Sequence, residues 1–279
     1  MATGDSTSGF LSKLGASVKS IVKMALKSRA PRLSPTAAEG ASLIILGNGP
    51  SLNRTMDEHQ ASLEANPLMA VNFAANAPQF RQLRPDYYIL VDPVFFNDLE
   101  NANVTRLWEQ LRSVSWPMIL FVPAGARIPV RLDGNVTVSR FNPVGVEGFH
   151  FLENFAYSHG LGMPRPRNVL IPAIMVGIAL GYKKIYLAGA DHSWTRTLEV
   201  TDDNTVVSVQ PHFYEDNEAE HARVASVYKD IRLHEIMLSF HIAFRSYFSI
   251  KRFAARQGCQ IINSTPGSFI DAFTRAPLP

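Results

Sequence analysis

Short apolar runs alternate with longer amphipathic stretches along most of the chain. Six runs have the length and composition of buried strands: 42–46, 68–73, 87–91, 116–122, 184–188 and 260–262. The segments between them are compatible with helices, at 55–65, 104–114, 168–180, 218–257 and 268–273. Strands that alternate with helices predict an α/β fold. We expect a single Rossmann-like domain with a mostly parallel sheet and helices on both faces.

The N-terminus has a different pattern. Between residues 10 and 27 five apolar side chains fall on one narrow arc of a helical wheel, and four lysines fall on the opposite side. The apolar set is Phe10, Leu14, Val18, Ile21 and Ala25, and the basic set is Lys13, Lys19, Lys23 and Lys27. This basic amphipathic helix is typical of a membrane-surface anchor. The alternative is a helix that docks on its own domain or on a partner subunit.

Residues 29–40 contain two prolines and several small residues, which predict a linker. The expected organisation is therefore a leader and linker over 1–40 and a catalytic domain over 41–279.

Composition and charge indicate a globular protein and argue against several functional classes. The chain of 279 residues is 46% hydrophobic and 18% charged, which is typical of a globular protein. Residues 1–40 hold six basic and two acidic residues, whereas the remainder holds 21 basic and 22 acidic residues. A body without net positive charge argues against a nucleic-acid partner. The single Cys259 excludes an internal disulfide and a multi-cysteine zinc site.

No apolar run reaches the ~18 residues of a membrane span, and no stretch has the pattern of a signal peptide. We therefore expect a cytoplasmic protein, peripheral on the inner face of the cytoplasmic membrane.

Polar residues follow four of the expected strands. They are Gly47-Asn48-Gly49-Pro50-Ser51, Asn72, Asp92 and Asp191-His192-Ser193. Ligands of parallel sheets bind outside the carboxyl ends of the strands, and these ends share one edge. The sequence therefore predicts one binding site assembled from four strand ends.

The glycine-rich turn at 47–51 has two interpretations. Glycines allow a phosphate to approach the backbone, where exposed N–H groups can hold it. The alternative is an ordinary strand-to-helix turn, because the segment matches neither the dinucleotide-binding fingerprint nor the Walker A loop. Asp92 is expected either as a turn former or helix cap, or as a ligand of a ribose hydroxyl or a metal. Asp191 has the same alternatives.

A serine hydrolase is a poor interpretation of residues 191–193, because adjacent residues cannot form the required relay and no nucleophile elbow is present. The eight histidines show no zinc-protease spacing. His212 lies beside aromatic residues in a long polar loop, 194–216, which predicts a lid and a general base. His234 and His241 share one face of an expected helix.

Several of these segments resemble the bacterial sialyltransferases of glycosyltransferase family 42. The similar segments are 45–52, Val71-Asn72-Phe73, 91–96, 179–191 and Thr265-Pro266-Gly267-Ser268. The same motifs occur in a wider superfamily that includes the 6-hydroxymethylpterin pyrophosphokinase MptE, the flagellin-modifying Maf proteins and proteins of surface-polysaccharide gene clusters. The Gly-Ala-Asp-His-Ser-Trp string at 189–194 is more similar to that last group.

The resemblance implies a Rossmann-like glycosyltransferase that uses a CMP-activated acidic sugar and requires no cofactor or metal. It implies that the nucleotide is bound by Gly47, Asn48, Gly49, Pro50, Ser51, Asn72, Asp92, Asn168, Ser193 and Tyr214. The catalytic residues would be His212, His192 and Asp191, with His241 as the alternative base. Two departures from the family are Asp92, where an Asn stands, and Asn168-Val169-Leu170, where Thr-Ser-Gly stands.

The expected function is the transfer of a sialic acid, another nonulosonic acid or a Kdo-type sugar from a CMP donor. The acceptor would be a bacterial surface glycan or a lipid-linked glycan, with residues 10–27 on the membrane. Relatives often form homo-oligomers. One alternative is a pyrophosphokinase that uses ATP and Mg²⁺, with Asp92 and Asp191 as metal ligands. Another is a nucleotide-binding protein without catalysis.

Overall fold

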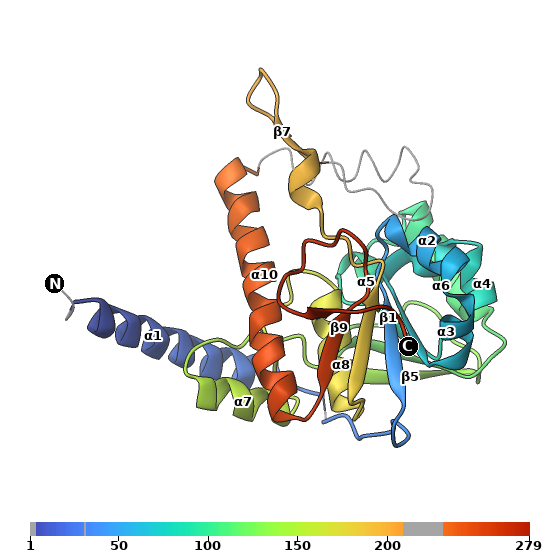
Figure 1. The fold of residues 1–279 in the computed structure, drawn as a ribbon, viewed down its shortest axis with the longest axis horizontal. Helices are drawn as coiled ribbons and strands as arrows, with labels where there is room; N and C mark the ends of the chain where they lie inside the picture. Colours follow the sequence, from blue (N-terminus) through green and yellow to red (C-terminus); the bar gives the residue numbers. More distant parts are fainter. Residues whose placement is uncertain (1–3, 31, 209–230) are drawn as a thin grey trace.

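The computed structural model describes residues 4–30, 32–208 and 231–279. Its centre is a parallel sheet of eight strands in the order β10-β9-β6-β1-β2-β3-β4-β5 (Figure 1). The strands are β1 (Ser42–Leu46), β2 (Leu68–Val71), β3 (Tyr87–Ile89), β4 (Met118–Pro123), β5 (Val136–Phe141), β6 (Lys184–Ala188), β9 (Gln260–Asn263) and β10 (Thr274–Arg275). A separate antiparallel pair joins β7 (Leu198–Val200) to β8 (Val206–Ser208). The predicted Rossmann-like α/β fold is confirmed.

Helices cover both faces of this sheet. One face packs against α7 (His150–Ser158), α8 (Leu170–Ala179) and α10 (Leu233–Arg256). The other face packs against α2 (Ser51–Glu58), α3 (Gln60–Ala65), the 3-10 helix η1 (Asn72–Asn76), α4 (Gln79–Leu83), α5 (Val94–Asn97) and α6 (Ala102–Arg112). The remaining helical elements are α1 (Gly4–Lys27) and η2 (Trp194–Thr197).

The apolar runs form central strands because both of their faces are buried. In β1, Leu43 and Ile45 point into the core under α8 and α10, whereas Ile44 and Leu46 point into the core under α2. Side chains of a strand alternate between faces, so a strand covered on both sides needs an uninterrupted apolar run. Helix α8 is buried along nearly its whole length, which explains why its sequence is apolar all round.

The order of the strands fixes the position of the ligand site. From β1 the chain builds β2, β3, β4 and β5 toward one edge, and it then returns to place β6, β9 and β10 on the other side. The reversal lies between β1 and β6, which pair in parallel from Ser42↔Lys184 to Leu46↔Ala188. Such a switch point leaves a crevice at the carboxyl ends of the strands, where ligands of this fold class bind.

Several elements differ from the sequence prediction, among them the following three. The predicted helix at 268–273 is wrong: this segment is a loop, because Ser268 Oγ donates to Ala190 O (2.6 Å) and Asn263 Nδ2 donates to Ile270 O (3.1 Å). The edge strand β5 was missed, because its middle residues are only partly buried and carry no continuous apolar run. The helix expected at 55–65 is two helices that meet at His59.

The leader is a helix, as predicted, although α1 begins at Gly4 rather than at residue 10. The described residues of the linker, 29–30 and 32–40, form no helix or strand, but they are bonded to the body. The N–H groups of Thr36 and Ala37 donate to Leu180 O, and the N–H of Arg29 donates to Asn142 Oδ1 (2.8 Å). In the part of the chain that the structure describes, no helix is long and apolar enough to cross a bilayer.

Candidate functional site

A cavity of about 470 Å³ opens at the switch point between β1 and β6. Its size is in the range of small-molecule sites. Ten of the residues selected from the sequence line it: Gly47, Asn48, Gly49, Pro50, Asn72, Asp92, Asn168, Asp191, His192 and Ser193. The structure therefore brings the four strand ends together around one cavity, together with the segment that precedes α8.

The glycine-rich turn after β1 is held against the turn after β6. Gly47 N donates to Ala188 O (2.8 Å) and Gly49 N donates to Gly189 O (2.9 Å). A Cβ at Gly49 would lie 2.0 Å from Asp191 Oδ2. These two N–H groups are already bonded within the protein, so the prediction that the turn holds a phosphate does not draw on them. The glycines are needed because the two turns approach too closely for a side chain.

The two carboxylates of the cavity have different surroundings. Asp191 Oδ2 accepts a hydrogen bond from Ser51 Oγ (2.6 Å), which places Ser51 behind the wall of the cavity. Asp92 is exposed, and its Oδ1 accepts from the N–H of Val94 (3.0 Å) at the start of α5. Asp92 therefore caps a helix turn, which was one of its two expected roles, while its other oxygen has no such bond.

Three residues that line the cavity have a side-chain amide in which one buried atom has no hydrogen bond to the described part of the chain. These atoms are Asn48 Oδ1, Asn72 Oδ1 and Asn168 Nδ2. Asn72 has a left-handed backbone (φ 51), which few residues other than glycine and asparagine adopt. Nearly all buried polar groups in folded proteins are bonded, so unpaired ones call for a physical explanation.

A hydrogen-bonded chain of three residues fixes the tautomer of His192. Asn168 Oδ1 accepts from the N–H groups of Leu170 (3.0 Å) and Ile171 (3.3 Å), which identifies it as the amide oxygen. The Tyr247 hydroxyl, 3.0 Å away, must therefore donate to this oxygen. The hydroxyl oxygen then accepts from Nε2–H of His192 (2.6 Å). The lone pair of the imidazole is consequently on Nδ1.

The environment of His192 keeps its ring neutral. The ring is buried, it stacks on Trp194 with centroids 4.1 Å apart, and burial lowers its pKa from 6.5 to about 3. The ring therefore supplies no positive charge near neutral pH. Its Nε2–H group already donates a hydrogen bond to the Tyr247 hydroxyl. His192 can accept a hydrogen bond from a ligand hydroxyl, but its low pKa makes it a weak base.

Arg167 is a lining residue that the sequence reasoning missed. Among the described residues that line the cavity it is the one Lys or Arg, and the cavity also holds Asp92 and Asp191. Its position in the Pro164-Arg165-Pro166-Arg167 segment was the available signal. Within the described ranges, no group of three or more His, Cys, Asp or Glu residues has the arrangement of a metal site.

Some expected catalytic residues are not placed at the cavity. His212 and Tyr214 lie outside the described residues. His241 is exposed on α10 and is not among the lining residues, and His234 is exposed at the second residue of the same helix. The long loop expected at 194–216 contains η2 and the β7–β8 hairpin up to residue 208, and Val206 of this hairpin packs on Ile236 and Phe240 of α10.

Comparisons with known proteins support the fold. No protein-family model matches the chain, and no curated protein matches it. Among solved structures, it is similar to a chain described as the MAf glycosyltransferase from Magnetospirillum magneticum AMB-1. The TM-score is 0.53 at 12% identity, over 95% of this chain and 38% of the other. The chain thus spans well under half of that protein, and the likeness is one of fold.

Proposed function

We propose that this protein is a glycosyltransferase whose cavity binds a nucleotide-activated sugar. The observation that carries the proposal is that Asn48, Asn72 and Asn168, each with an unpaired buried amide atom, line one cavity at the switch point of the sheet. A nucleotide offers the phosphate oxygens, ribose hydroxyls and base edges that match such a mixed set. The likeness to a MAf glycosyltransferase supports the same class.

The donor that we propose is a CMP-activated nonulosonic acid or Kdo-type sugar, and the acceptor is a bacterial surface glycan. In the reaction the bond between the anomeric carbon and the phosphate oxygen breaks, and CMP leaves with the electron pair. The acceptor oxygen bonds to the same carbon, and its proton passes to a base. We propose that Arg167 and Asn168, which both line the cavity, stabilise the charge on the departing phosphate.

We propose His212 as the base and Tyr214 as a group near the leaving phosphate. Asp191 and Ser51 hold the glycine-rich turn, and Asp92 and Ser193 border the bound nucleotide. His192 would accept a hydrogen bond from a donor or acceptor hydroxyl through Nδ1. We propose residues 10–27 as the contact with the inner face of the cytoplasmic membrane, where a lipid-linked acceptor would lie.

Binding of free nucleotides tests whether the cavity binds the nucleotide part of the proposed donor. The thermal midpoint would be measured with CMP, UDP, GDP and ATP, each with Mg²⁺ and with a chelator. A ligand at ~100 times its Kd adds about 2.7 kcal/mol to the free energy of unfolding, which is readily detected. We expect a shift with CMP that is insensitive to the chelator. Absence of a shift with all four nucleotides would refute the proposal.

Two asparagines provide a matched pair of variants. Asn48→Ala removes a cavity amide, whereas Asn76→Ala removes an amide that also has an unpaired buried oxygen but does not line the cavity. We expect both variants to lose a similar amount of stability and only Asn48→Ala to lose nucleotide affinity. Equal affinity of the two variants would place the nucleotide elsewhere.

A Mg²⁺-dependent pyrophosphokinase is the second candidate. The observation in its favour is that Asp92 and Asp191 line the same cavity and carboxylates are ligands of Mg²⁺. A shift with ATP that requires Mg²⁺, without a shift with CMP, would support it over the glycosyltransferase. A shift with CMP but no turnover of any donor would leave a nucleotide-binding protein without catalysis.

A further inference from the structure

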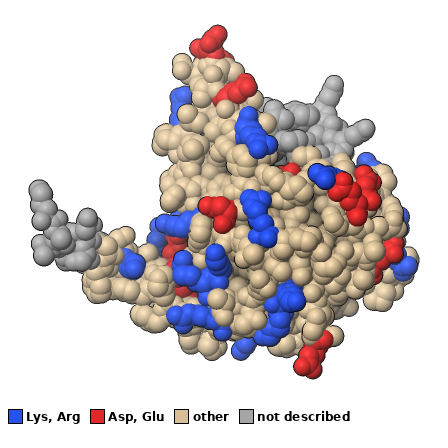
Figure 2. Space-filling view, in the orientation of Figure 1, with Lys and Arg blue, Asp and Glu red and all other residues tan. Residues whose placement is uncertain are grey.

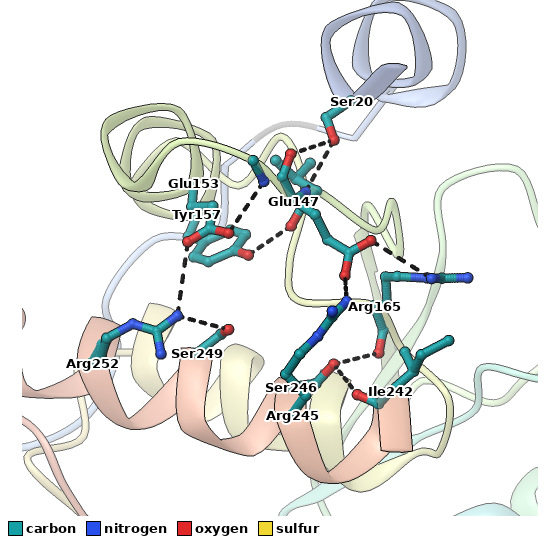
Figure 3. Close-up of polar contacts among 12 residues, drawn as sticks. Ser20, Glu147, Glu153, Tyr157, Arg165, Ile242, Arg245, Ser246, Ser249 and Arg252 are labelled. Atoms are coloured by element: carbon teal, nitrogen blue, oxygen red, sulfur yellow. Dashed lines mark hydrogen bonds and ion pairs between the residues drawn. The ribbon is translucent and has the colours of Figure 1, made fainter. Parts of the chain in front are cut away.

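Helix α1 packs on the body with its small polar side chains and leaves its apolar side exposed. Ser17 and Ser20 are buried. Ser17 Oγ accepts from Phe149 N (3.0 Å). Ser20 Oγ donates to Glu147 O (2.8 Å) (Figure 3). The apolar side chains of α1 that remain exposed are Phe10, Leu11, Leu14, Val18, Ile21, Val22 and Leu26. Most of the apolar face is therefore not covered by the helix's own domain, although the ring of Phe10 contacts that of Phe149.

Helix α7 adds phenylalanines to the same exposed surface. Phe151 is 75% exposed and Phe155 is 53% exposed, although both belong to a helix whose other side packs in the core. Phe149 joins the two helices: its ring lies 5.4 Å from that of Phe10 and stacks on that of Phe151 at 5.9 Å. Figure 1 shows α1 and α7 side by side. The two helices thus share one apolar surface, which we call the α1–α7 surface.

The close approach of the two helices is built into the backbone. Gly148, just before α7, has φ +139, and a Cβ there would lie 2.1 Å from Ser17 Oγ. Any side chain at this position would push α1 away from the segment 147–149. The α1–α7 surface is therefore a fixed feature of the fold, because both the glycine and the two serine hydrogen bonds hold it.

Positive charge borders the α1–α7 surface. Lys13, Lys19 and Lys27 are exposed on α1. The carboxylates of the α7 segment are paired: Glu147 contacts Arg165 and Arg245, and Glu153 contacts Arg252 (Figure 3). Glu153 also contacts His150. Figure 2 shows Lys and Arg side chains gathered where α1 meets α7 and the C-terminal half of α10. The charge around the apolar surface is thus predominantly positive.

An exposed apolar surface bordered by positive charge favours one kind of partner. A second copy of the chain in a twofold arrangement would bring the same lysines face to face around the contact, because such an interface pairs a surface with itself. A bilayer with anionic headgroups accepts apolar side chains below the headgroups and attracts Lys and Arg at the surface. Exposed apolar patches of this extent mark interaction sites.

We propose that α7 enters an anionic lipid surface together with α1, with Phe151 and Phe155 as inserting side chains. This extends the membrane contact proposed for residues 10–27, and it is independent of the reaction. Two helices joined by Gly148 and the two serines would fix the orientation of the body on the membrane, which a single mobile helix would not.

Vesicle partition tests the proposal. The full chain would be mixed with vesicles of phosphatidylcholine alone and vesicles of phosphatidylcholine with phosphatidylglycerol in equal parts, and the bound fraction would be measured by sedimentation. We expect binding to the anionic vesicles only. The double variant Phe151→Ser, Phe155→Ser should partition roughly tenfold less for each phenylalanine removed from the bilayer. The matched control is Leu99→Ser, which removes an apolar side chain of 49% exposure far from α1 and should bind as the wild type.

The outcomes separate the two membrane proposals. If Phe10→Ser reduces binding and the α7 double variant binds as Leu99→Ser does, the contribution of α7 is refuted and that of residues 10–27 stands. If no variant or wild-type protein binds anionic vesicles, both are refuted. If light scattering shows a dimer that the α7 double variant abolishes, and vesicles bind neither form, the surface is an interface between copies.

Discussion

Acid is expected to destabilise this protein through His192. Burial lowers the pKa of this side chain to about 3 in the folded protein, against an ordinary value of 6.5 in the unfolded chain. Between these values the unfolded state binds a proton that the folded state does not, so stability is fully present above pH ~6.5 and is lost as the pH falls toward 3. From pH ~7 to pH ~5 the loss for this one group is about 2 kcal/mol.

The measurement is urea unfolding, followed by tryptophan fluorescence, of the wild type and of His192→Asn at both pH values. Asparagine is chosen because His192 has φ 50, and asparagine adopts this left-handed backbone more readily than most residues. The variant is expected to be less stable than the wild type at pH 7, but its further loss on acidification should be about 2 kcal/mol smaller.

A control variant excludes the other histidines as the source. His241→Asn removes an exposed histidine from α10 and should leave the acid-dependent loss as large as in the wild type. Equal losses in the wild type and in His192→Asn would show that His192 titrates normally in the folded protein. The neutral, Nε2-protonated ring inferred from its bonds would then be wrong.

Two further predictions concern the walls of the cavity. Gly49→Ala places a Cβ against the Asp191 carboxylate and should cost roughly 1–3 kcal/mol of unfolding free energy in a urea titration, whereas Gly125→Ala, with open space around it, should be close to neutral. Tyr247→Phe removes a hydroxyl that bonds both His192 and Asn168, and it should cost about 1–3 kcal/mol because two buried groups lose a partner. A Tyr247→Phe variant as stable as the wild type would argue against the chain of hydrogen bonds.

The parts of the site that follow directly from strand ends were predictable from the sequence. Asn48, Asn72, Asp92 and Asp191 each stand just after an apolar run, and parallel strands bring such positions to one edge. Asn168 was selected through the family resemblance, and it also lines the cavity. Sequence reasoning therefore identified much of the cavity without any knowledge of distances.

Other features of the site could not be recognised from the sequence. Tyr247 is one of several aromatic residues on the inner side of α10, and nothing in the sequence separates it from those that only fill the core. Its partner His192 is 55 positions earlier in the chain. The sequence also gave no sign that the N–H groups of Gly47 and Gly49 bond to the end of β6 and the turn after it. These bonds depend on how closely two turns that are distant in the sequence approach each other.

The sequence by itself determined the class of fold, because alternating apolar runs and helical periods leave few arrangements that bury both faces of each strand. It also determined that the leader is an amphipathic basic helix. Only the tertiary structure decided which side of that helix faces the body: Ser17 and Ser20 fit against the backbone at 147–149, so the apolar side faces outward. Helical periodicity reports which side chains share a face, whereas the surface that a face meets depends on contacts more than 100 residues away along the chain.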